Sequence, residues 1–598
     1  MKNTLIALFF STFLAGCVTS NIQSTRLDNN KPLPQGHGIV AVQVINNAER
    51  LATWHKGWTE VIAIRLDNRE ELKQAAIAKA REKAKGKKID SENVDWDVEA
   101  YSLTALPEGL IDSQMFVGSM PQGKYLISSL YSFYSDGNLS SWVSIPVYFS
   151  AGTYQVKDKQ FTNLGSLVFQ PLLSIKKKSF WNNSSTQKAY VTRVDEREKL
   201  ATFVQSHYPN LAKDVNFADV LQWDQDEDIS EYRSTLGKIS RNNAYGSQGI
   251  SLSKHAKGAV AAKFGQLRVL QNDDTWLQID LPTNGQIAAI LEGQDKVLIA
   301  GERGQVFVGD DLLGEWQSIS PVSAKEALIW FGQGAKAAYA LSSSAKDYRL
   351  YELSSDLLTW TEVGRFTKKK ANDFWVQNGG IFPLITREKT IRVINDNTVY
   401  DLDPLSKEWL NKKGRSLVDM AQLNDGTLLA LDVSQWDGVG DQIVSFDDGD
   451  TWTTIGRRLN IFSDNKTERT LPGIMADGTL VSLGRLKKGE GLKIITQSKA
   501  HIGEKKAWQA HGDARLDCQT LLPELSANKI LYFLCEQGQI VATADFGKSW
   551  KTEVDINLQQ MQQDYEALLE ALKTQQDLEK EQEQEGKSPE SEKADSTL

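Results

Sequence analysis

A tryptophan recurs seven times in the C-terminal half of the chain, and this repeat restricts the possible folds more than any other feature. The seven residues are Trp276, Trp316, Trp360, Trp409, Trp452, Trp508 and Trp550. They stand 40 to 56 residues apart, and each interval holds three or four short β-forming runs separated by turn residues. Four-stranded units at this period are typical of a β-propeller, whose ring must close because a single blade leaves apolar faces exposed. The repeat therefore predicts a mainly β protein with a seven-bladed propeller over residues 246–555.

Parts of the repeat agree closely enough to place individual strands. Glu302–Val306 and Glu536–Ile540 share a pattern, and each begins fourteen residues before its tryptophan. Asp425–Leu428 and Asp477–Leu480 each open an apolar run with an Asp-Gly turn. In the last unit we expect strands at residues 517–522, 529–535, 539–544 and 549–554.

The turn before the tryptophan is well formed in two units. Residues 445–452 read Ser-Phe-Asp-Asp-Gly-Asp-Thr-Trp, and residues 543–550 read Thr-Ala-Asp-Phe-Gly-Lys-Ser-Trp. In such a hairpin the aspartate can accept hydrogen bonds from backbone N–H groups, the glycine takes a conformation closed to other residues, and the tryptophan packs between sheets. We therefore predict a structural and not a catalytic role for Ser445, Asp447, Gly449, Thr451, Trp452, Thr543, Asp545, Gly547, Ser549 and Trp550. Degenerate versions of the turn hold Asp310, Asp356 and Asp403.

These two turns fit the Asp-box pattern Ser-x-Asp-x-Gly-x-Thr-Trp, the second with serine and threonine exchanged. The repeat region thus resembles the propellers of sialidases and other bacterial neuraminidase-repeat proteins, of sortilin-like receptors and of a photosystem assembly factor. Sialidases also need an Arg-Ile-Pro stretch, an arginine triad and a Tyr/Glu pair, and the sequence contains no Arg-Ile-Pro. No nucleophile elbow, phosphate-binding glycine loop or dinucleotide fingerprint replaces it. We therefore expect no catalytic residues and no enzyme activity.

The N-terminus carries the features of an export signal. Residues 1–16 join a lysine to an apolar run that is too short to span a bilayer as a stable helix. The stretch Leu14–Cys17 resembles the bacterial lipobox, which implies that Cys17 becomes an acylated N-terminus anchored in a membrane. Val18 and Thr19 follow in place of aspartate, which by the family's sorting rule implies the outer membrane. The alternative is a plain secretory signal with an incidental cysteine.

Three segments are expected between this signal and the repeat. Polar residues with two prolines predict a tether over residues 17–37. Short β runs separated by Gly, Pro and Asn predict a small antiparallel β-sandwich domain over residues 38–180. Within it, the Ala- and Lys-rich residues 69–88 predict a helix whose charges form a solvated face or a contact for anionic headgroups. Residues 190–245 predict a short helical connector.

Composition excludes several classes of function. The net charge of −9 argues against a strongly basic surface for nucleic acid, and most of that charge lies in the acidic C-terminal segment. The six histidines show no pairing at metal-ligand spacing. We therefore expect no nucleic-acid partner, no metal and no cofactor.

Cys518 and Cys535 fall opposite each other if residues 517–522 and 529–535 form a hairpin. Export would place the pair in an oxidising compartment, which favours a cross-strand disulfide. Two small buried hydrophobic residues are an equally good interpretation.

The C-terminal segment predicts an amphipathic helix over residues 556–580 and a disordered acidic tail over residues 581–598. Its apolar stripe is Leu558, Met561, Tyr565, Leu568 and Leu572. The stripe either packs on the propeller rim or docks a partner.

These features predict a non-enzymatic outer-membrane lipoprotein, anchored through Cys17, whose propeller face binds envelope proteins as a scaffold or assembly factor. The alternative is a cell-surface protein that binds or hydrolyses glycans. A hydrolase would need two carboxylates about 5–10 Å apart in the channel mouth, together with arginines or aromatic residues.

Overall fold

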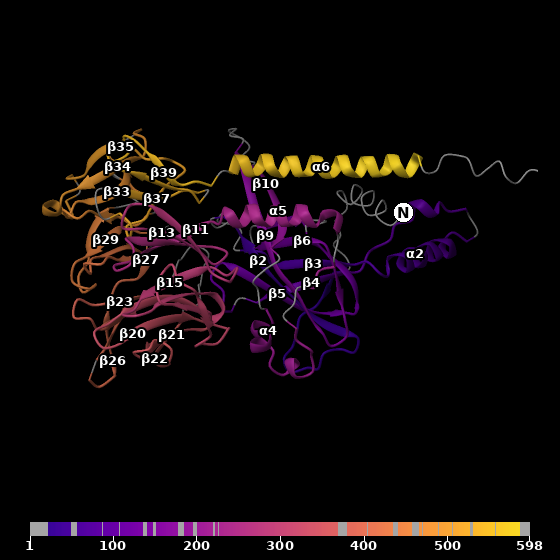
Figure 1. Ribbon diagram of the computed structural model, residues 1–598, viewed down its shortest axis with the longest axis horizontal. Helices are drawn as coiled ribbons and strands as arrows, with labels where there is room; N and C mark the ends of the chain where they lie inside the picture. Colours follow the sequence, from indigo (N-terminus) through magenta and orange to yellow (C-terminus); the bar gives the residue numbers. More distant parts are fainter. Residues whose placement is uncertain are drawn as a thin grey trace, which may run out of the picture.

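The computed structural model forms a ring of blades, a sheet domain beside it and a long C-terminal helix that runs along the sheet domain (Figure 1). The structure describes residues 22–48, 57–85, 88–106, 108–135, 140–147, 151–176, 185–194, 200–218, 222–224, 227–368, 379–403, 405–433, 440–456, 466–468, 470–487, 489–504, 506–526, 530–536, 538–556 and 558–585. Among these residues, no helix combines the length and the apolar character needed to cross a membrane.

Seven sheets form the ring, and the strand order in the sheets follows the chain. The first three blades are β11 (Gly246–Ser251), β12 (Gly258–Ala262), β13 (Gln266–Leu270) and β14 (Trp276–Asp280); β15 (Ile287–Glu292), β16 (Val297–Gly301), β17 (Val306–Gly309) and β18 (Gln317–Ile319); and β19 (Ala327–Gln333), β20 (Ala338–Ser343), β21 (Asp347–Leu353) and β22 (Trp360–Thr367).

The next two blades are β23 (Ile381–Ile385), β24 (Ile391–Asn395), β25 (Thr398–Leu402) and β26 (Trp409–Lys413); and β27 (Leu417–Gln422), β28 (Leu428–Asp432), β29 (Gln442–Ser445) and β30 (Thr453–Gly456). The last two are β31 (Lys466–Thr467), β33 (Leu480–Arg485), β34 (Lys493–Gln497) and β35 (Gln509–Asp513), with β32 (Gly473–Ile474) also on β33; and β36 (Thr520–Leu521), β37 (Leu531–Leu534), β38 (Ile540–Thr543) and β39 (Lys551–Val554). The predicted seven-bladed propeller is confirmed.

Apolar side chains between neighbouring blades hold the ring together. Each of the seven spaces between blades holds its own buried cluster. At the closure, Val260 of the first blade packs with Leu534 of the last, and the rings of Trp276 and Tyr532 meet with 5.8 Å between their centroids. In the described residues no strand is shared between the first and last blades, so side-chain packing closes the ring.

The N-terminal domain forms one continuous sheet and not the expected two-sheet sandwich. Its strands are β1 (Ile22–Ser24), β2 (His37–Asn46), β3 (Glu60–Arg65), β4 (Ala100–Leu106), β5 (Ser113–Pro121), β6 (Gly123–Ser135), β7 (Ser140–Pro146), β8 (Thr153–Val156), β9 (Phe161–Lys176) and β10 (Ser185–Val194). Their order is β10-β9-β2-β5-β4-β3-β6-β7, with β1 beside β4 and β8 beside β6. The pairs β2–β9 and β1–β4 are parallel, so the domain is not purely antiparallel either.

Alternation along β2 shows why both faces of this sheet are covered. Val40, Val42 and Val44 enter the main core, while Ile39 and Ala41 enter a second cluster on the other face. Short helices of the connector supply the cover for that second cluster. The mostly apolar strand β2 is therefore buried on both sides, and one sheet can hold two cores.

The predicted tether over residues 17–37 differs from the structure, because residues from Ile22 onward belong to the fold. β1 pairs with β4, the hydroxyl of Thr25 donates to the Ser102 carbonyl at 2.6 Å, and Leu27 is buried. The apolar and β-branched residues of this segment pack on the sheet. The polar residues around them made the segment resemble a tether in the sequence.

The connector holds three helices within the expected segment. It contains α4 (Ala201–His207), the short 3-10 helix η3 (Leu211–Lys213) and α5 (Glu227–Asn242), but β10 continues to Val194 and so moves the domain boundary past residue 180. Within the sheet domain, α2 (Arg69–Lys83) is the helix expected at residues 69–88, and η2 (Ser91–Asn93) follows it.

Buried polar contacts dock the sheet domain on one face of the ring. Glu302, in the short helix η4 (Glu302–Gly304) between β16 and β17, accepts hydrogen bonds from the three backbone N–H groups of residues 111–113 at 2.9 to 3.1 Å. The ammonium group of Lys263, in the turn between β12 and β13, lies 2.5 Å from the Asp112 carboxylate. The sheet domain thus covers the face that carries the turns between second and third strands.

The C-terminal helix α6 (Leu558–Glu585) packs on the sheet domain, so the prediction that it covers the propeller rim is wrong. Met561 is buried in a cluster with residues of β9, β10 and α5, and the ring of Tyr565 stacks on Tyr190 with 4.9 Å between centroids. Leu568 packs partly buried against the same cluster, whereas the side chains of Leu558 and Leu572 lie outside the described residues. The helix reaches Glu585, beyond the expected start of disorder at residue 581, and residues 586–598 lie outside the described part.

Candidate functional site

The two Asp-box turns have closely similar internal hydrogen bonds. Asp447 accepts from the Thr451 backbone N–H at 2.9 Å and from the Thr451 hydroxyl at 2.6 Å, and the Ser445 hydroxyl accepts from the Gly449 N–H at 2.9 Å. Gly449 has φ +88°, a left-handed conformation that glycine adopts without strain. The Asp447 carboxylate accepts hydrogen bonds from within its own turn, so its role is structural.

In the second turn, Thr543, Asp545, Gly547 and Ser549 make the same set of contacts, with Asp545 accepting from the Ser549 N–H and hydroxyl at 2.8 and 2.7 Å. Hydrogen bonds from Ser549 lower the pKa of Asp545 to about 2. A carboxylate held ionised in this way is a poor general acid at neutral pH.

The repeated tryptophans link neighbouring blades. The indole nitrogen of Trp508 donates to the Ile455 carbonyl at 2.9 Å, and that of Trp550 donates to the Asp513 carbonyl at 3.3 Å, in each case on the last strand of the preceding blade. Trp452 packs partly buried between its blade and the one before. These three side chains therefore hold neighbouring blades together.

Cys518 and Cys535 form a disulfide that ties the start of the last blade to the end of β37. Asp517 lies beside them, but sulfurs that are bonded to each other do not supply the thiolate ligands of a metal site. Cys17, the expected lipidation site, lies outside the described residues.

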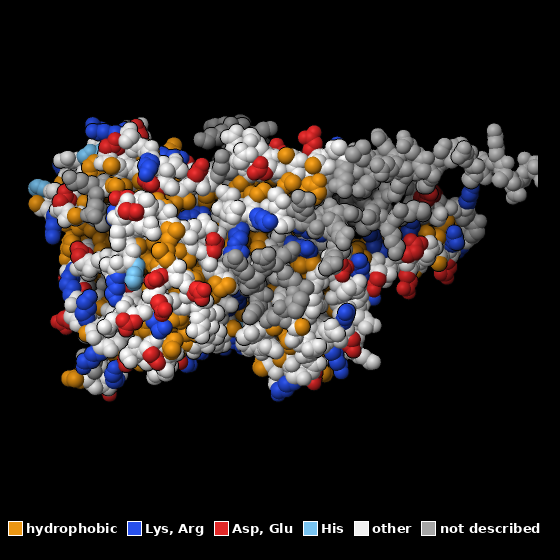
Figure 2. Space-filling view, in the orientation of Figure 1, with side chains coloured by type: hydrophobic (Ala, Val, Ile, Leu, Met, Phe, Trp, Pro, Cys, Tyr) orange, Lys and Arg blue, Asp and Glu red, His pale blue; other side chains and the backbone are white. Residues whose placement is uncertain are grey.

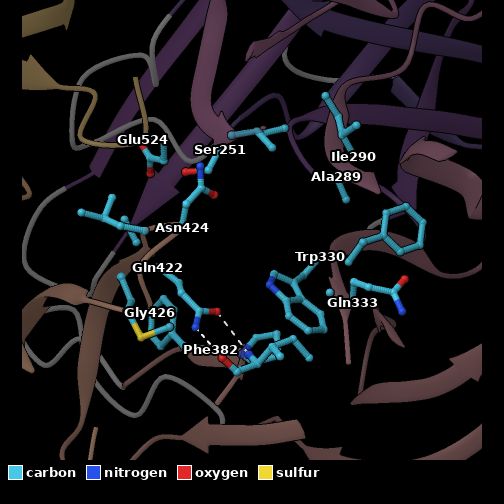
Figure 3. Close-up of a pocket in the computed structure, with 18 of the residues that line it drawn as sticks. Ser251, Ala289, Ile290, Trp330, Gln333, Phe382, Gln422, Asn424, Gly426 and Glu524 are labelled. Atoms are coloured by element: carbon cyan, nitrogen blue, oxygen red, sulfur yellow. Dashed lines mark hydrogen bonds between the residues drawn. The ribbon is translucent and has the colours of Figure 1, made fainter. Parts of the chain in front are cut away.

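A pocket lies at the propeller channel. A cavity of about 680 Å³ is lined by the first strands of the first five blades and by the turns that follow some of them. Its walls carry apolar, amide and acidic side chains, among them Gln248, Ile290, Trp330, Phe382, Asp419 and Glu524. Figure 3 shows the labelled side chains around an open centre, with Glu524 and Trp330 on opposite sides.

This mouth is on the face of the ring opposite the sheet domain. Glu524 and residues 423–426 belong to turns between first and second strands, whereas the docked Glu302 and Lys263 belong to turns between second and third strands. In antiparallel blades these two kinds of turn lie at opposite ends. The mouth therefore remains open when the sheet domain is in place.

A bulge recurs in the channel-lining strands. The register shifts after Gly246, Ile287, Leu328 and Leu417, so that Trp330 and Asp419 follow the bulge at equivalent positions of the third and fifth blades. An extra residue at this point re-aims the side chains that follow it. The same local irregularity thus places an aromatic ring and a carboxylate at the channel.

Two carboxyl groups of the mouth have raised pKa values. Desolvation by the channel wall raises the pKa of Asp419 to about 6. Burial and, to a lesser extent, the charge of Asp419 raise the pKa of Glu524 to about 7. Among the described residues neither carboxylate has an ion-pair partner, while Arg387 in the same lining contacts Asp448 at 3.5 Å. The mouth therefore holds two carboxyl groups that no ion pair of the described residues compensates.

Amide side chains bridge neighbouring channel strands. The Gln248 amide donates to the Ala288 carbonyl at 2.6 Å, and Gln422 both accepts from the Ile385 N–H and donates to the Ile385 carbonyl. Figure 3 shows the Gln422 contacts as dashed lines. These bridges fix the spacing of the strands that surround the cavity.

Sequence reasoning missed the whole channel site. Trp330 is not one of the seven repeated tryptophans, and Asp419 and Glu524 stand in no motif. The usable signal was position: Trp330 and Asp419 each stand two residues after the leucine at which the strand register shifts, Leu328 and Leu417, so an alignment of first strands would have brought them together.

No family model matches the sequence, and no curated protein matches it significantly. Among solved structures, YCF48 from Cyanidioschyzon merolae is 13% identical with a TM-score of 0.34, covering 46% of this chain and 88% of its own. BamB from Moraxella catarrhalis is 14% identical with a TM-score of 0.30, covering 51% and 96%. A structure of YCF48 bound to D1 peptide is 14% identical with a TM-score of 0.35, covering 51% and 93%.

Proposed function

We propose that this protein is a non-enzymatic lipoprotein of the outer membrane whose propeller binds a partner protein in its open channel mouth, as a scaffold or assembly factor of the cell envelope. The observation that carries the proposal is the cavity of about 680 Å³, which combines Trp330 and Phe382 with amide and acidic groups. Concave sites with an apolar lining and a few polar groups are the usual form of a binding site.

The arrangement of the two domains supports presentation of this mouth to a partner. Four residues separate Cys17 from β1, so a lipid on Cys17 would hold the sheet domain within about 17 Å of the membrane, at about 3.4 Å per residue. The docked sheet domain occupies one face of the ring, and the mouth opens on the other. Acidic and basic side chains are interspersed over the viewed surface, without an extended basic face for nucleic acid (Figure 2).

A glycan-directed function is the second candidate, because Trp330 and the two carboxylates share one mouth, as a glycan-binding site would require. The described lining of the cavity has Arg387 as its arginine, and its guanidinium already contacts Asp448. An arginine triad of the sialidase kind is therefore absent from this lining, which favours the binding function.

Two variants of the full chain test the proposal. The Cys17→Ala variant should no longer be found in the outer-membrane fraction and should not carry the acyl label. Continued acylation of this variant would contradict anchoring through Cys17. Trp330→Ala should lose partners that the intact protein captures by cross-linking in its native envelope, while remaining folded at the temperature of the assay. The control is Trp142→Ala, which removes an exposed tryptophan of the sheet domain. Equal losses in both variants, or turnover of a sialoside by the intact protein, would contradict the proposal.

A further inference from the structure

We propose, on the basis of the function above, that the channel mouth binds an extended peptide segment bearing a lysine or arginine side chain, with the cation between Asp419 and Glu524 and an apolar neighbour on Trp330. The proposal thus specifies the kind of peptide segment that the partner protein must contain.

The backbone of the ring favours an extended ligand. β11, β15, β19, β23 and β27 each lie at the end of their own sheet, so one edge of each faces the channel without a strand partner in the described residues. An exposed strand edge binds a peptide through main-chain hydrogen bonds, and alternate side chains of that peptide then reach the walls. Gln248 occupies part of the β15 edge at Ala288, and Gln422 occupies part of the β23 edge at Ile385, which limits the positions where a peptide can pair.

The charge of the mouth selects a cation. Asp419 stands on β27, and Glu524 on the turn between β36 and β37, close enough for its charge state to respond to that of Asp419. Asp425 adds a third carboxylate to the lining, and the lining cations are Arg387, which faces Asp448, and Lys389. A guanidinium or ammonium group between two carboxylates forms charge-assisted hydrogen bonds, which are stronger than neutral ones.

Two glycines make room for the side chains that would recognise the ligand. A Cβ on Gly249 of β11 would lie 2.5 Å from Oε2 of Glu524, so the missing side chain lets this carboxylate rest against the strand. A Cβ on Gly332 of β19 would lie 2.2 Å from the Trp330 indole, so here too a glycine lets the ring lie against its own strand. Neither glycine has a positive φ, hence space and not backbone strain explains both.

Trp330 lies across the opening from Glu524. Figure 3 places Trp330 and Phe382 around the lower part of the mouth and Glu524 at the upper part. An indole face also attracts a cation, but an ionised carboxylate attracts it more strongly, so the two carboxyl groups determine where the cation sits. The apolar residue next to the cation in the ligand then packs on the indole of Trp330.

Fluorescence anisotropy with three labelled seven-residue peptides tests this inference on the full-length protein. The probes alternate valine with lysine, with norleucine or with glutamate, and are otherwise identical. We expect the lysine peptide to bind at least tenfold more tightly than the norleucine peptide and the glutamate peptide not to bind. Equal binding of the lysine and norleucine peptides would overturn the role of charge, and binding of none would overturn the peptide ligand.

Variants locate the binding. The double variant Asp419→Asn with Glu524→Gln should lose at least tenfold in affinity for the lysine peptide, whereas Asp310→Asn, on an exposed turn, should change nothing. Gly332→Ala should displace the Trp330 indole and so lower the affinity for the lysine and norleucine peptides alike. The ratio of these two affinities should stay the same. Unchanged affinity in the double variant would overturn the site.

Failure of this inference is distinguishable from failure of the proposed function. If partner capture still depends on Trp330 but the lysine peptide does not bind, the mouth is a binding site for another chemistry. Displacement of the peptide by a sialylated or peptidoglycan oligosaccharide would instead assign the mouth to glycans and overturn the inference.

Discussion

Glu302 and Ser113 belong to different domains, and the Ser113 hydroxyl donates a hydrogen bond of 2.6 Å to the Glu302 carboxylate. Glu302 is 2% exposed, so its charge is solvated by the sheet domain and not by water. The equivalent repeat position in the last blade is Glu536, whose side chain is exposed. One position of the repeat has thus become a buried link between the domains.

Replacing Glu302 with alanine should therefore weaken the domain contact. The change leaves three backbone N–H groups and the Ser113 hydroxyl without an acceptor, which should cost about 3 kcal/mol. Urea unfolding followed by limited proteolysis should show cleavage within residues 108–113 at lower urea than in the intact protein. Glu536→Ala is the matched control and should stay within about 0.5 kcal/mol. A similar shift in both variants would show that the contact does not hold the domains together.

Asp447 should matter for the stability of its blade. Asp447→Ala removes the acceptor of two hydrogen bonds from Thr451 and should lower the free energy of unfolding by about 1–3 kcal/mol. Asp310→Ala, in a degenerate turn where the carboxylate is 90% exposed, should change it by less than about 0.5 kcal/mol. Peptide binding measured on folded Asp447→Ala should be unchanged, and a loss of binding at an unchanged melting temperature would mean that Asp447 contacts ligand.

The propeller was predictable because a tryptophan and short β-forming runs recur in seven units along the sequence. A turn such as 445–452 is determined by its own residues, which satisfy one another within eight positions. The sheet domain was not, because the choice between one sheet and two depends on pairs such as Ile39 with Phe161, far apart in sequence. The channel site was hidden for the same reason: Asp419 and Glu524 are 105 residues apart and meet only when the ring closes.

Removal of α6 should destabilise the sheet domain and leave the propeller intact. Truncation after Asp555 exposes the surface on which Met561 and Tyr565 pack, and each buried apolar side chain contributes about 1.5–3 kcal/mol. Differential scanning calorimetry should show a lower melting temperature for one of two transitions. Tyr565→Ala should reproduce part of this shift, whereas Glu566→Ala, on an exposed position beside it, should not. An unchanged melting temperature together with loss of all captured partners would make α6 the docking element.

The raised pKa values of Asp419 and Glu524 predict how stability changes with pH. Their folded pKa values, about 6 and about 7, exceed those of the unfolded chain, about 3.9 and 4.3, so the folded state binds more protons between these limits. The stability that these groups contribute is fully present below about pH 4 and is lost as the pH rises through 6 and 7.

The double variant Asp419→Asn with Glu524→Gln has no such loss. The difference between its melting temperature and that of the intact protein should therefore increase from pH 5 to pH 8. Asp545→Asn should behave in the opposite way. Because the folded pKa of Asp545 is about 2, its contribution is present above the unfolded value of about 3.9 and is lost as the pH falls toward 2. This variant should be less stable than the intact protein at pH 7 and approach it near pH 2. Melting curves at pH 2, 5 and 8 compare each of the two variants with the intact protein. Parallel pH profiles for the two variants would contradict the assignment of opposite pKa shifts.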